Sequence, residues 1–578
     1  MNRIDRAVIA VLVLVFAVAA IAIGGPALTS KLQIVSSSAN PSGPAAEPYR
    51  EGVLSRPSNV NPLAARTQAD RDLIALVFEG LVARSADGQP KPAIARTWSS
   101  SETGDAWTFQ LNPDRRWQDG EPVTAADVVF TIATLQDPAY RGPGAGSWTG
   151  ITVSAVDAET VRFELATPIG GFLELATQPI VPRHLLVDTA PGAMADAAFG
   201  RAPIGSGPYA IDQLDRDHAV LLRSAGSATP ALASGAPAQS PSGDPLVTPV
   251  PTHRPGGANL SLDRLELRFF DDAGTLTTAF RNGELDVVSG LDPAAATALA
   301  ATPGARSIVY PTTTLAAVAL NLHPTEPAFA DPRTRLALLE AIDRPRIIRV
   351  AYGGGAARAD GLIPPTSWAF DAVASPPIAR DLKAAVKALG QAGWKNAKDG
   401  WHQAAAPTPR TIELLVPDPK ANPILFAAGS QIAADWTALG FKVDVVQEDP
   451  ATIATDHLRT GQFEAAVVGI AIGHDPDLYP LLASSQIRTG GANVIGLQDP
   501  VLDDLLVKAR KPAPDAARIA AYAALQARLA GGTYVLPIAW PDEVVVVANR
   551  LVGLAPREVA DGSERFADVL TWRLADDR

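Results

Sequence analysis

The chain has 578 residues, of which 47% are hydrophobic and 19% charged, and its formal net charge is −12 at pH 7. Because a single hydrophobic core stops growing at about 250–300 residues, we expect two large lobes or three to four smaller domains. The acidic balance and the absence of a long basic run argue against nucleic acid as a partner, and the absence of cysteine excludes disulfides, thiolate metal sites and thiol nucleophiles.

An apolar run at residues 7–23 follows Arg3 and Arg6 at the N-terminus. In a helix this run would cover ~25 Å, just short of the usual hydrocarbon thickness, and it is longer than the core of about 7–15 residues that is typical of a signal peptide. A cleaved signal and an uncleaved anchor both fit, and we favour an anchor at residues 1–24. The arginines favour a cytoplasmic N-terminus, so we expect the remaining chain in the periplasm or at the cell surface, anchored in the cytoplasmic membrane.

Two stretches are rich in Ser, Pro, Ala and Gly and show no periodicity. Residues 25–48 are typical of a flexible tether. Residues 224–258 lie between the strand-like segments 219–223 and 262–270, so we expect a long surface loop there rather than a domain linker.

The N-terminal half carries mixed helix and strand signals. Residues 151–156 and 161–165 alternate in polarity and are separated by turn residues, which predicts a hairpin. Thr124, with Asp127 three residues later, is a typical helix start and predicts a helix over residues 125–135. These signals favour a hairpin-rich α+β lobe.

A further helix is predicted at residues 333–342. Asp331 is placed to cap it, and Pro332 fits the first helical turn. Glu340 and Arg344 are four positions apart and are expected to form an ion pair on the helix surface.

The clearest parallel unit lies late in the chain. A strand at residues 411–416 is followed by a helix that starts at Asn422 and Pro423 and stops at Gly440, and then by a second strand at residues 441–446. This βαβ pattern implies a parallel sheet, so the C-terminal half is expected to form an open α/β lobe. In such sheets ligands sit beyond the carboxyl ends of the strands.

A series of short segments resembles, in the same order along the chain, the motifs of a known protein family. In chain order they are LVFEGLVA (76–83), PAIA and TW (92–98), WTFQLNPDRRWQDGEPVTAADVV (107–129), VPRH (181–184), GSGPY (205–209), NGELD (282–286), LN (320–321), the helix region 331–344, IPPTSWAF (363–370), QAGW (391–394) and DPDLYPLLASSQ (475–486). Together they resemble the large solute-binding proteins of oligopeptide-, dipeptide- and nickel-type ABC importers, known as family 5, over residues 50–555.

This resemblance implies an α/β fold of the two-lobed periplasmic-binding-protein type, of the large class, with a small α+β domain inserted in lobe I. The chain is expected to begin with an N-terminal segment and a tether. Lobe I is then formed by three separate segments of the chain, with the small domain inserted after the first, and lobe II is formed by one continuous segment. The ranges are 1–24 (anchor or signal), 25–48 (tether), 49–85 (lobe I), 86–203 (inserted domain), 204–272 (lobe I), 273–536 (lobe II) and 537–578 (C-terminal return to lobe I).

The resemblance also indicates which residues meet the ligand. Family members that grip peptides carry Trp-x-x-Asp before an Asp/Glu-Pro pair, and that Asp holds the free amine of the peptide. Here Gly469 and Ile472 stand at those two positions, so binding of ordinary free-amine peptides is in doubt. Either Asp475 or Asp477 replaces the anchor, or the ligand is neutral or anionic.

Several side chains are candidates for ligand contact, and each also has a purely structural explanation. For the acidic pair, capping of the helix near Leu478 is favoured over ligand contact. A Trp is more often a core residue, and polar groups after a strand or in a loop are common. No metal, no cofactor and no catalytic residue is expected. The candidates are Asn321, Trp368, His474, Asp475, Asp477, Ser485, Gln486 and Trp540.

The predicted function is capture of a peptide or other small solute between two lobes, which close about strands near Gly207, Asn321 and Pro537. The expected partners are a permease and ATPase subunits, since the chain has no Gly-x-x-x-x-Gly-Lys-Ser/Thr loop of its own. We expect a monomer. A membrane-tethered ligand sensor or assembly factor built on the same fold is the alternative, and a secreted hydrolase is a third.

Overall fold

The computed structural model describes residues 48–575 except 86–87, 145–146, 225–261, 404–407, 488–490 and 513–514. The predicted anchor lies outside the described residues, as do the tether apart from Pro48 and the 224–258 loop apart from Ser224. Among helices of the described ranges, none combines the length and apolar character needed to cross a membrane.

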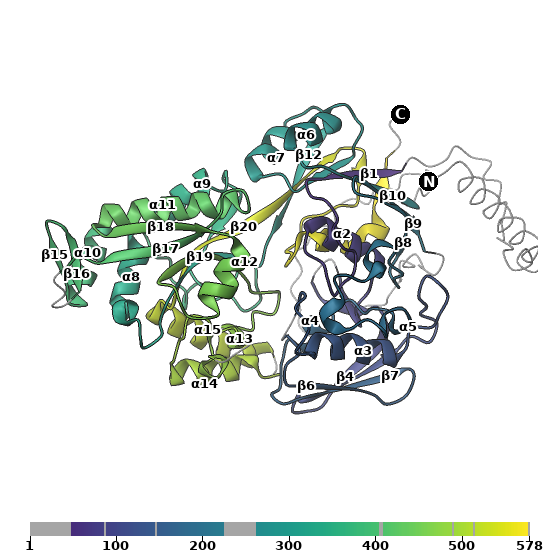
Figure 1. The fold of residues 1–578 in the computed structure, drawn as a ribbon, viewed down its shortest axis with the longest axis horizontal. Helices are drawn as coiled ribbons and strands as arrows, with labels where there is room; N and C mark the ends of the chain where they lie inside the picture. Colours follow the sequence, from purple (N-terminus) through teal and green to yellow (C-terminus); the bar gives the residue numbers. More distant parts are fainter. Residues whose placement is uncertain are drawn as a thin grey trace, which may run out of the picture. The chain divides into compact units, whose positions relative to one another are not determined.

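One long strand, β20 (Val535–Ala548), is shared by the two halves of a 12-stranded sheet (Figure 1). Its first half pairs with β13 (Thr314–Leu320), and its second half pairs with β12 (Ala305–Pro311). Since β12 and β13 are consecutive, the chain crosses between the halves a second time at residues 312–313. We call the half that contains β12 lobe I and the half that contains β13 lobe II.

The sheet of lobe I is covered on both faces. Alternate residues of β20 face different cores: Val545 and Val547 belong to a cluster with the helix α2 (Gln68–Val77), whereas Val544 and Val546 pack in another cluster with the helices α6 and α7. This alternation is what the two-residue period of a strand requires. The other elements are β1 (Tyr49–Val53), β8 (Tyr209–Leu214), β9 (His218–Arg223), β10 (Arg264–Phe269), β11 (Val287–Ser289), α6 (Ala273–Arg281) and α7 (Pro293–Ala300).

The segment 273–311 was expected in lobe II, and its strands pair instead with those of lobe I. The strand β11 pairs with β1 and with the second half of β20, and β12 also pairs with that half. We therefore propose a start of lobe II near residue 312 in place of 273.

A separate four-stranded sheet of order β4-β5-β7-β6 lies within the range predicted for the inserted domain. The predicted hairpin is confirmed, since β6 and β7 pair antiparallel. So is the predicted helix start, because the backbone amide and the hydroxyl of Thr124 both donate to Asp127, at 2.8 and 2.9 Å. The elements are β4 (Ala95–Ser100), β5 (Ala106–Leu111), α3 (Ala125–Gln136), β6 (Ile151–Ala155) and β7 (Thr160–Leu165).

Lobe II is an α/β layer structure, as predicted from its βαβ pattern. The strands β17 and β18 pair in parallel, and Gly440 adopts a φ of 107° to end the helix between them. The strand β13 faces two cores, with Ala316, Val318 and Leu320 on one side and Leu315, Ala317 and Ala319 on the other. In Figure 1, α11 lies on one side of β17 and β18, and α14 and α15 lie on the other. The elements are α8 (Pro332–Ala341), α10 (Leu382–Gln391), β17 (Thr411–Pro417), α11 (Pro423–Leu439), β18 (Lys442–Glu448), β19 (Ala465–Ala471), α13 (Tyr479–Leu482), α14 (Pro500–Arg510) and α15 (Asp515–Gly532).

The expected ion pair between Glu340 and Arg344 is wrong. The helix α8 ends at Ala341, and Arg344 turns inward, where its guanidinium donates to the carbonyls of Ala359 and Ile378 and pairs with Asp360 at 3.3 Å. A buried guanidinium needs such partners more than a surface carboxylate does.

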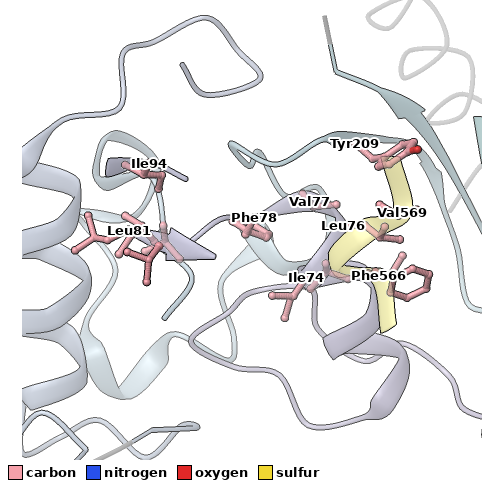
Figure 2. Close-up of a cluster of buried hydrophobic side chains, with 14 of the residues drawn as sticks. Ile74, Leu76, Val77, Phe78, Leu81, Ile94, Tyr209, Phe566 and Val569 are labelled. Carbon is pink, nitrogen blue, oxygen red and sulfur yellow. The ribbon is translucent and has the colours of Figure 1, made fainter. Parts of the chain in front are cut away.

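The C-terminal segment returns to lobe I. Figure 2 shows Phe566 and Val569 of the helical segment η6 (Gly562–Thr571) packed beside Ile74 and Leu76 of α2. Arg565, whose side chain is 1% exposed, bonds to Glu51 at 2.7 Å and to Asp72 at 2.6 Å, so the return is held by buried ion pairs as well as by apolar packing.

Candidate functional site

Three segments meet where the chain crosses between the lobes. Thr312 donates to the carbonyl of Pro541 through its amide at 3.2 Å and its hydroxyl at 2.7 Å, which ties the two crossings together. The amide of Thr313 donates to Val559 in the C-terminal return, and the amide of Ile472 donates to Thr313. The loop that follows β19 is therefore fixed directly to a crossing.

The lobe movement was expected near Gly207, Asn321 and Pro537, and the crossings lie elsewhere. Pro537 pairs with Ala317 inside lobe II, and Asn321 follows the end of β13 that is remote from the crossing. Gly207 donates its amide to Val77 within lobe I. The chain instead passes between the lobes at residues 312–313 and near residue 541.

The family position for the amine-binding carboxylate holds a buried side chain. Ile472 is 8% exposed and packs in the apolar core of lobe II. Gly469, at the position of the family tryptophan, is exposed on β19. These two positions therefore offer neither a charge nor an aromatic ring.

Asp475 is engaged within lobe II. Both of its carboxylate oxygens accept from Arg518, each at 3.0 Å, in a bidentate ion pair. The guanidinium of Arg518 also lies 4.6 Å from the ring centroid of Trp368. Trp368 is 42% exposed, so this stacked pair borders solvent.

Asp477 is also engaged within lobe II. One oxygen accepts from Arg510 at 2.8 Å, and the other accepts from the amide of Tyr479 at 3.1 Å, at the start of α13. Burial raises the pKa of Asp477 above its usual value, and the charge of Arg510 opposes that rise. Of the two carboxylates that were candidates for capping this helix, only Asp477 accepts a hydrogen bond from an amide at its start, and the N-cap residue itself is Leu478.

His474 lies between two carboxylates of the C-terminal return. Its Nδ1 is 3.1 Å from Glu558, and its Nε2 is 2.8 Å from Glu564. Burial alone would lower the pKa of His474, but the hydrogen bonds to Glu558 and Glu564 outweigh it, so the pKa is raised above 6.5. Protonation of His474 is therefore easier here than protonation of an ordinary exposed imidazole.

Of the remaining candidates, Asn321 and Trp540 are internal. The side-chain amide of Asn321 donates to the carbonyls of Gly461 at 2.9 Å and Phe463 at 2.7 Å, which uses both of its N–H groups. Trp540 is 3% exposed in the lobe II core.

Ser485 and Gln486 lie at the surface of lobe II. The hydroxyl of Ser485 is 2.9 Å from that of Tyr479, and the amide of Gln486 is 3.5 Å from Ser485. The structure thus brings His474, Asp475 and Asp477 together, with Trp368 beside Arg518, and separates Asn321 and Trp540 from them by placing both in the core.

Sequence reasoning missed the carboxylates and cations that surround this loop. Glu558 and Glu564 contact His474 from the C-terminal return, and Arg84, paired with Glu174 in lobe I, is close enough for its pKa to respond to Asp475, Glu558 and Glu564. None of these residues forms a motif of fixed spacing. Only the tertiary structure could reveal them.

Lobe II also carries a small, partly open pocket of about 30 Å³, which is lined among others by Asp360, Ser375, Gln526 and Tyr534. Across the described ranges, no group of three or more His, Asp or Glu side chains is arranged to hold a metal ion.

Comparison with known proteins gives a consistent result. Residues 89–490 match the family described as "Bacterial extracellular solute-binding proteins, family 5 Middle". The chain is 26% identical to Protein XP55 of Streptomyces lividans over 520 residues, covering 88% of this chain and 86% of that protein. It is 24% identical to the glutathione-binding protein GsiB of Escherichia coli K12 over 486 residues, covering 81% of this chain and 84% of that protein.

Among solved structures, the oligopeptide-binding protein AppA from Bacillus subtilis, in complex with a nonapeptide, superposes with a TM-score of 0.70 at 18% identity. The match covers 92% of this chain and 99% of AppA. At 18% sequence identity, this structural similarity establishes the fold but does not identify the ligand.

Proposed function

The chain belongs to the bacterial extracellular solute-binding proteins of family 5, and from this membership we propose that it captures its solute between lobes I and II and releases it to a separate membrane permease. It is the solute-binding component of an ABC importer. Since its own sequence lacks a nucleotide-binding loop, ATP hydrolysis belongs to partner subunits.

The match over residues 89–490 is the observation that carries this proposal. The two crossings at residues 312–313 and 541 support this mechanism, because in the described ranges they are the places where the chain passes from one lobe to the other, and two lobes linked in this way can open and close. A solute that touches both lobes favours the closed form by its differential affinity, and moving the ratio from about 1:99 to 99:1 requires ~5.5 kcal/mol.

For the solute itself, we propose a molecule that does not depend on a free amine anchored at position 472. Three observations support this choice: Ile472 is buried and apolar, Asp475 is taken up by Arg518, and Asp477 is taken up by Arg510. An ammonium group buried without a carboxylate would cost several kcal/mol. A peptide with a blocked amine, or a neutral or anionic solute, avoids that cost.

Of the predicted ligand contacts we retain Trp368, Ser485 and Gln486. Trp368 presents an exposed aromatic face, and aromatic and apolar surfaces line most small-molecule sites. Ser485 and Gln486 keep partly exposed hydrogen-bonding groups. Asn321 and Trp540 are dropped from the proposed set because their side chains are occupied or enclosed.

We also propose that residues 7–23 anchor the protein in the cytoplasmic membrane. The length and apolar character of the run support this. Anchoring would raise the concentration of the binding protein near its permease.

Native mass spectrometry of the purified chain tests the proposed function, because a captured solute would appear as a mass that is lost on denaturation. Isothermal titration then compares a peptide with its N-acetylated form. We expect the acetylated form to bind at least as tightly. Tight binding of the free-amine peptide alone would contradict the proposed solute class, while leaving the importer function intact.

A further inference from the structure

The loop of residues 472–477, which we name the clasp loop, belongs to lobe II and contacts lobe I at two separate places. We propose that this loop is a clasp that holds the lobes closed before any solute is bound. The proposal is independent of which solute the protein carries.

The first contact is made by His474. Its two ring nitrogens face Glu558 and Glu564, which lie in the return segment that packs on α2 of lobe I. The side chain of His474 is 10% exposed, so the ring is enclosed by this contact. When the ring is protonated, each of its hydrogen bonds to a carboxylate is stronger than a hydrogen bond between two neutral groups.

The second contact places Gly171 of lobe I against Asp475, and its neighbour Gly170 against Arg510 and Arg518 of lobe II. A Cβ atom on Gly171 would lie 2.5 Å from Cγ of Asp475, and one on Gly170 would lie 3.0 Å from Cζ of Arg518. The amide of Gly170 also donates to the carbonyl of Arg510 in lobe II at 2.7 Å. The two glycines therefore allow a close approach that a larger residue would prevent.

The clasp loop is already shaped within lobe II. Arg518 fixes Asp475, Arg510 fixes Asp477, and the amide of Ile472 is fixed at the crossing. Because these bonds need no contribution from lobe I, closing the lobes orders few additional side chains and loses little conformational entropy. A loop that already has its bound conformation in the open form therefore favours closure of the lobes.

A clasp of this kind changes what the solute has to supply. If the empty protein is mostly closed, the solute needs less differential affinity to complete closure. The geometry thus predicts that the unliganded chain populates the closed form, and that adding one methyl group at Gly171 shifts the population towards the open form. Gly171 has a φ of −86°, which alanine adopts without strain.

Pulsed electron–electron double resonance on the full chain in detergent tests the proposal. Spin labels are attached through Thr152→Cys in lobe I and Asp504→Cys in lobe II, both at exposed positions, and these are the only thiols because the sequence has no cysteine. Bound solute is first removed by unfolding and refolding, and its absence is verified by native mass spectrometry.

We expect the parent protein to show mainly the short, closed distance. Gly171→Ala should lower the closed-to-open ratio about tenfold, as overpacking at a tight contact does. Gly390→Ala, at an exposed helical glycine with no atom within 4 Å of the added Cβ, is the matched control and should leave the ratio unchanged.

His474→Gln provides a second variant that leaves the glycines intact, and it should also lower the closed-to-open ratio. Thermal unfolding verifies that each variant is folded. An open parent protein, or a distance distribution that neither Gly171→Ala nor His474→Gln alters, would overturn the clasp. Solute capture could persist in either case, so failure of the clasp is distinguishable from failure of the proposed function.

Discussion

The Nε2 atom of His474 lies 2.8 Å from a carboxylate oxygen of Glu564, although the two residues are 90 positions apart and belong to different lobes. This contact makes the charge of one imidazole a component of the lobe–lobe interaction. The arrangement leads directly to a pH dependence.

We expect closure of the empty protein to weaken as pH rises. The pKa of His474 is raised in the closed form because Glu558 and Glu564 outweigh the effect of burial, while the positive charge of Arg84 opposes them. A group whose pKa is raised in one state favours that state fully below its ordinary pKa of about 6.5, and the preference is lost as pH rises through the raised pKa. The closed fraction should therefore be high at pH 5 and fall as pH rises through the raised pKa of His474.

The closed fraction is measured by the spin-label distance from pH 5 to pH 9. The charged groups that act on the ring are Glu558 and Glu564 from the return segment and Arg84 from lobe I. In His474→Gln the dependence should largely disappear. An equally steep profile in that variant would assign the effect to another group.

The sequence predicted local structure better than it predicted this contact. The βαβ unit followed from helical periodicity and from Gly440, and the hairpin at residues 151–165 followed from alternation; both depend on neighbours in the chain. The contact of His474 with Glu558 depends on how two lobes close, over a separation of 84 positions, and no local pattern encodes it. The wrong pairing of Glu340 with Arg344 has the same origin, because buried carbonyls compete for the guanidinium.

Restoring the family carboxylate by Ile472→Asp should destabilise the protein by about 2–4 kcal/mol, since the side chain would enter an apolar core without a partner. Urea denaturation measures the loss. Ile472→Val is the matched control and should cost about 0.5–1.5 kcal/mol. A stable Ile472→Asp protein that gains affinity for free-amine peptides would show that position 472 borders the ligand after all.

Removing the cation at Arg565 should destabilise the protein by about 3–5 kcal/mol, because Glu51 and Asp72 would remain buried without a positive partner. Arg565→Met preserves much of the volume and isolates the charge. The exposed pair of Arg333 with Asp331 provides a control, since Arg333→Met should cost less than about 1 kcal/mol. Equal losses in the two variants would contradict a structural role for the buried ion pairs.

Ionisation of Glu543 should lower the free energy of unfolding as pH rises towards 8. Burial raises the pKa of this carboxyl from 4.5 to about 7, and the charge of Arg565 only partly opposes that rise. Because the folded state binds this proton more tightly than the unfolded state, its contribution is complete below pH 4.5 and is lost as pH rises through about 7. Glu543→Gln removes the ionisation and should raise the free energy of unfolding at pH 8 by about 1–3 kcal/mol relative to the parent.

Urea denaturation at pH 4.5 and pH 8 compares Glu543→Gln with Glu102→Gln, a change of the same chemistry at an exposed position. The free energy of unfolding of Glu543→Gln should exceed that of the parent by an amount that grows with pH. The free energy of unfolding of Glu102→Gln should stay close to that of the parent at both pH values. Glu543 borders the crossing at residue 541, and its oxygens lie where a Cβ atom on Gly562 of the return segment would be. A neutral side chain there removes a charge from the contact between β20 and the return segment. If the difference in free energy of unfolding between Glu543→Gln and the parent did not grow with pH, solvent would have to reach this carboxylate in the folded state.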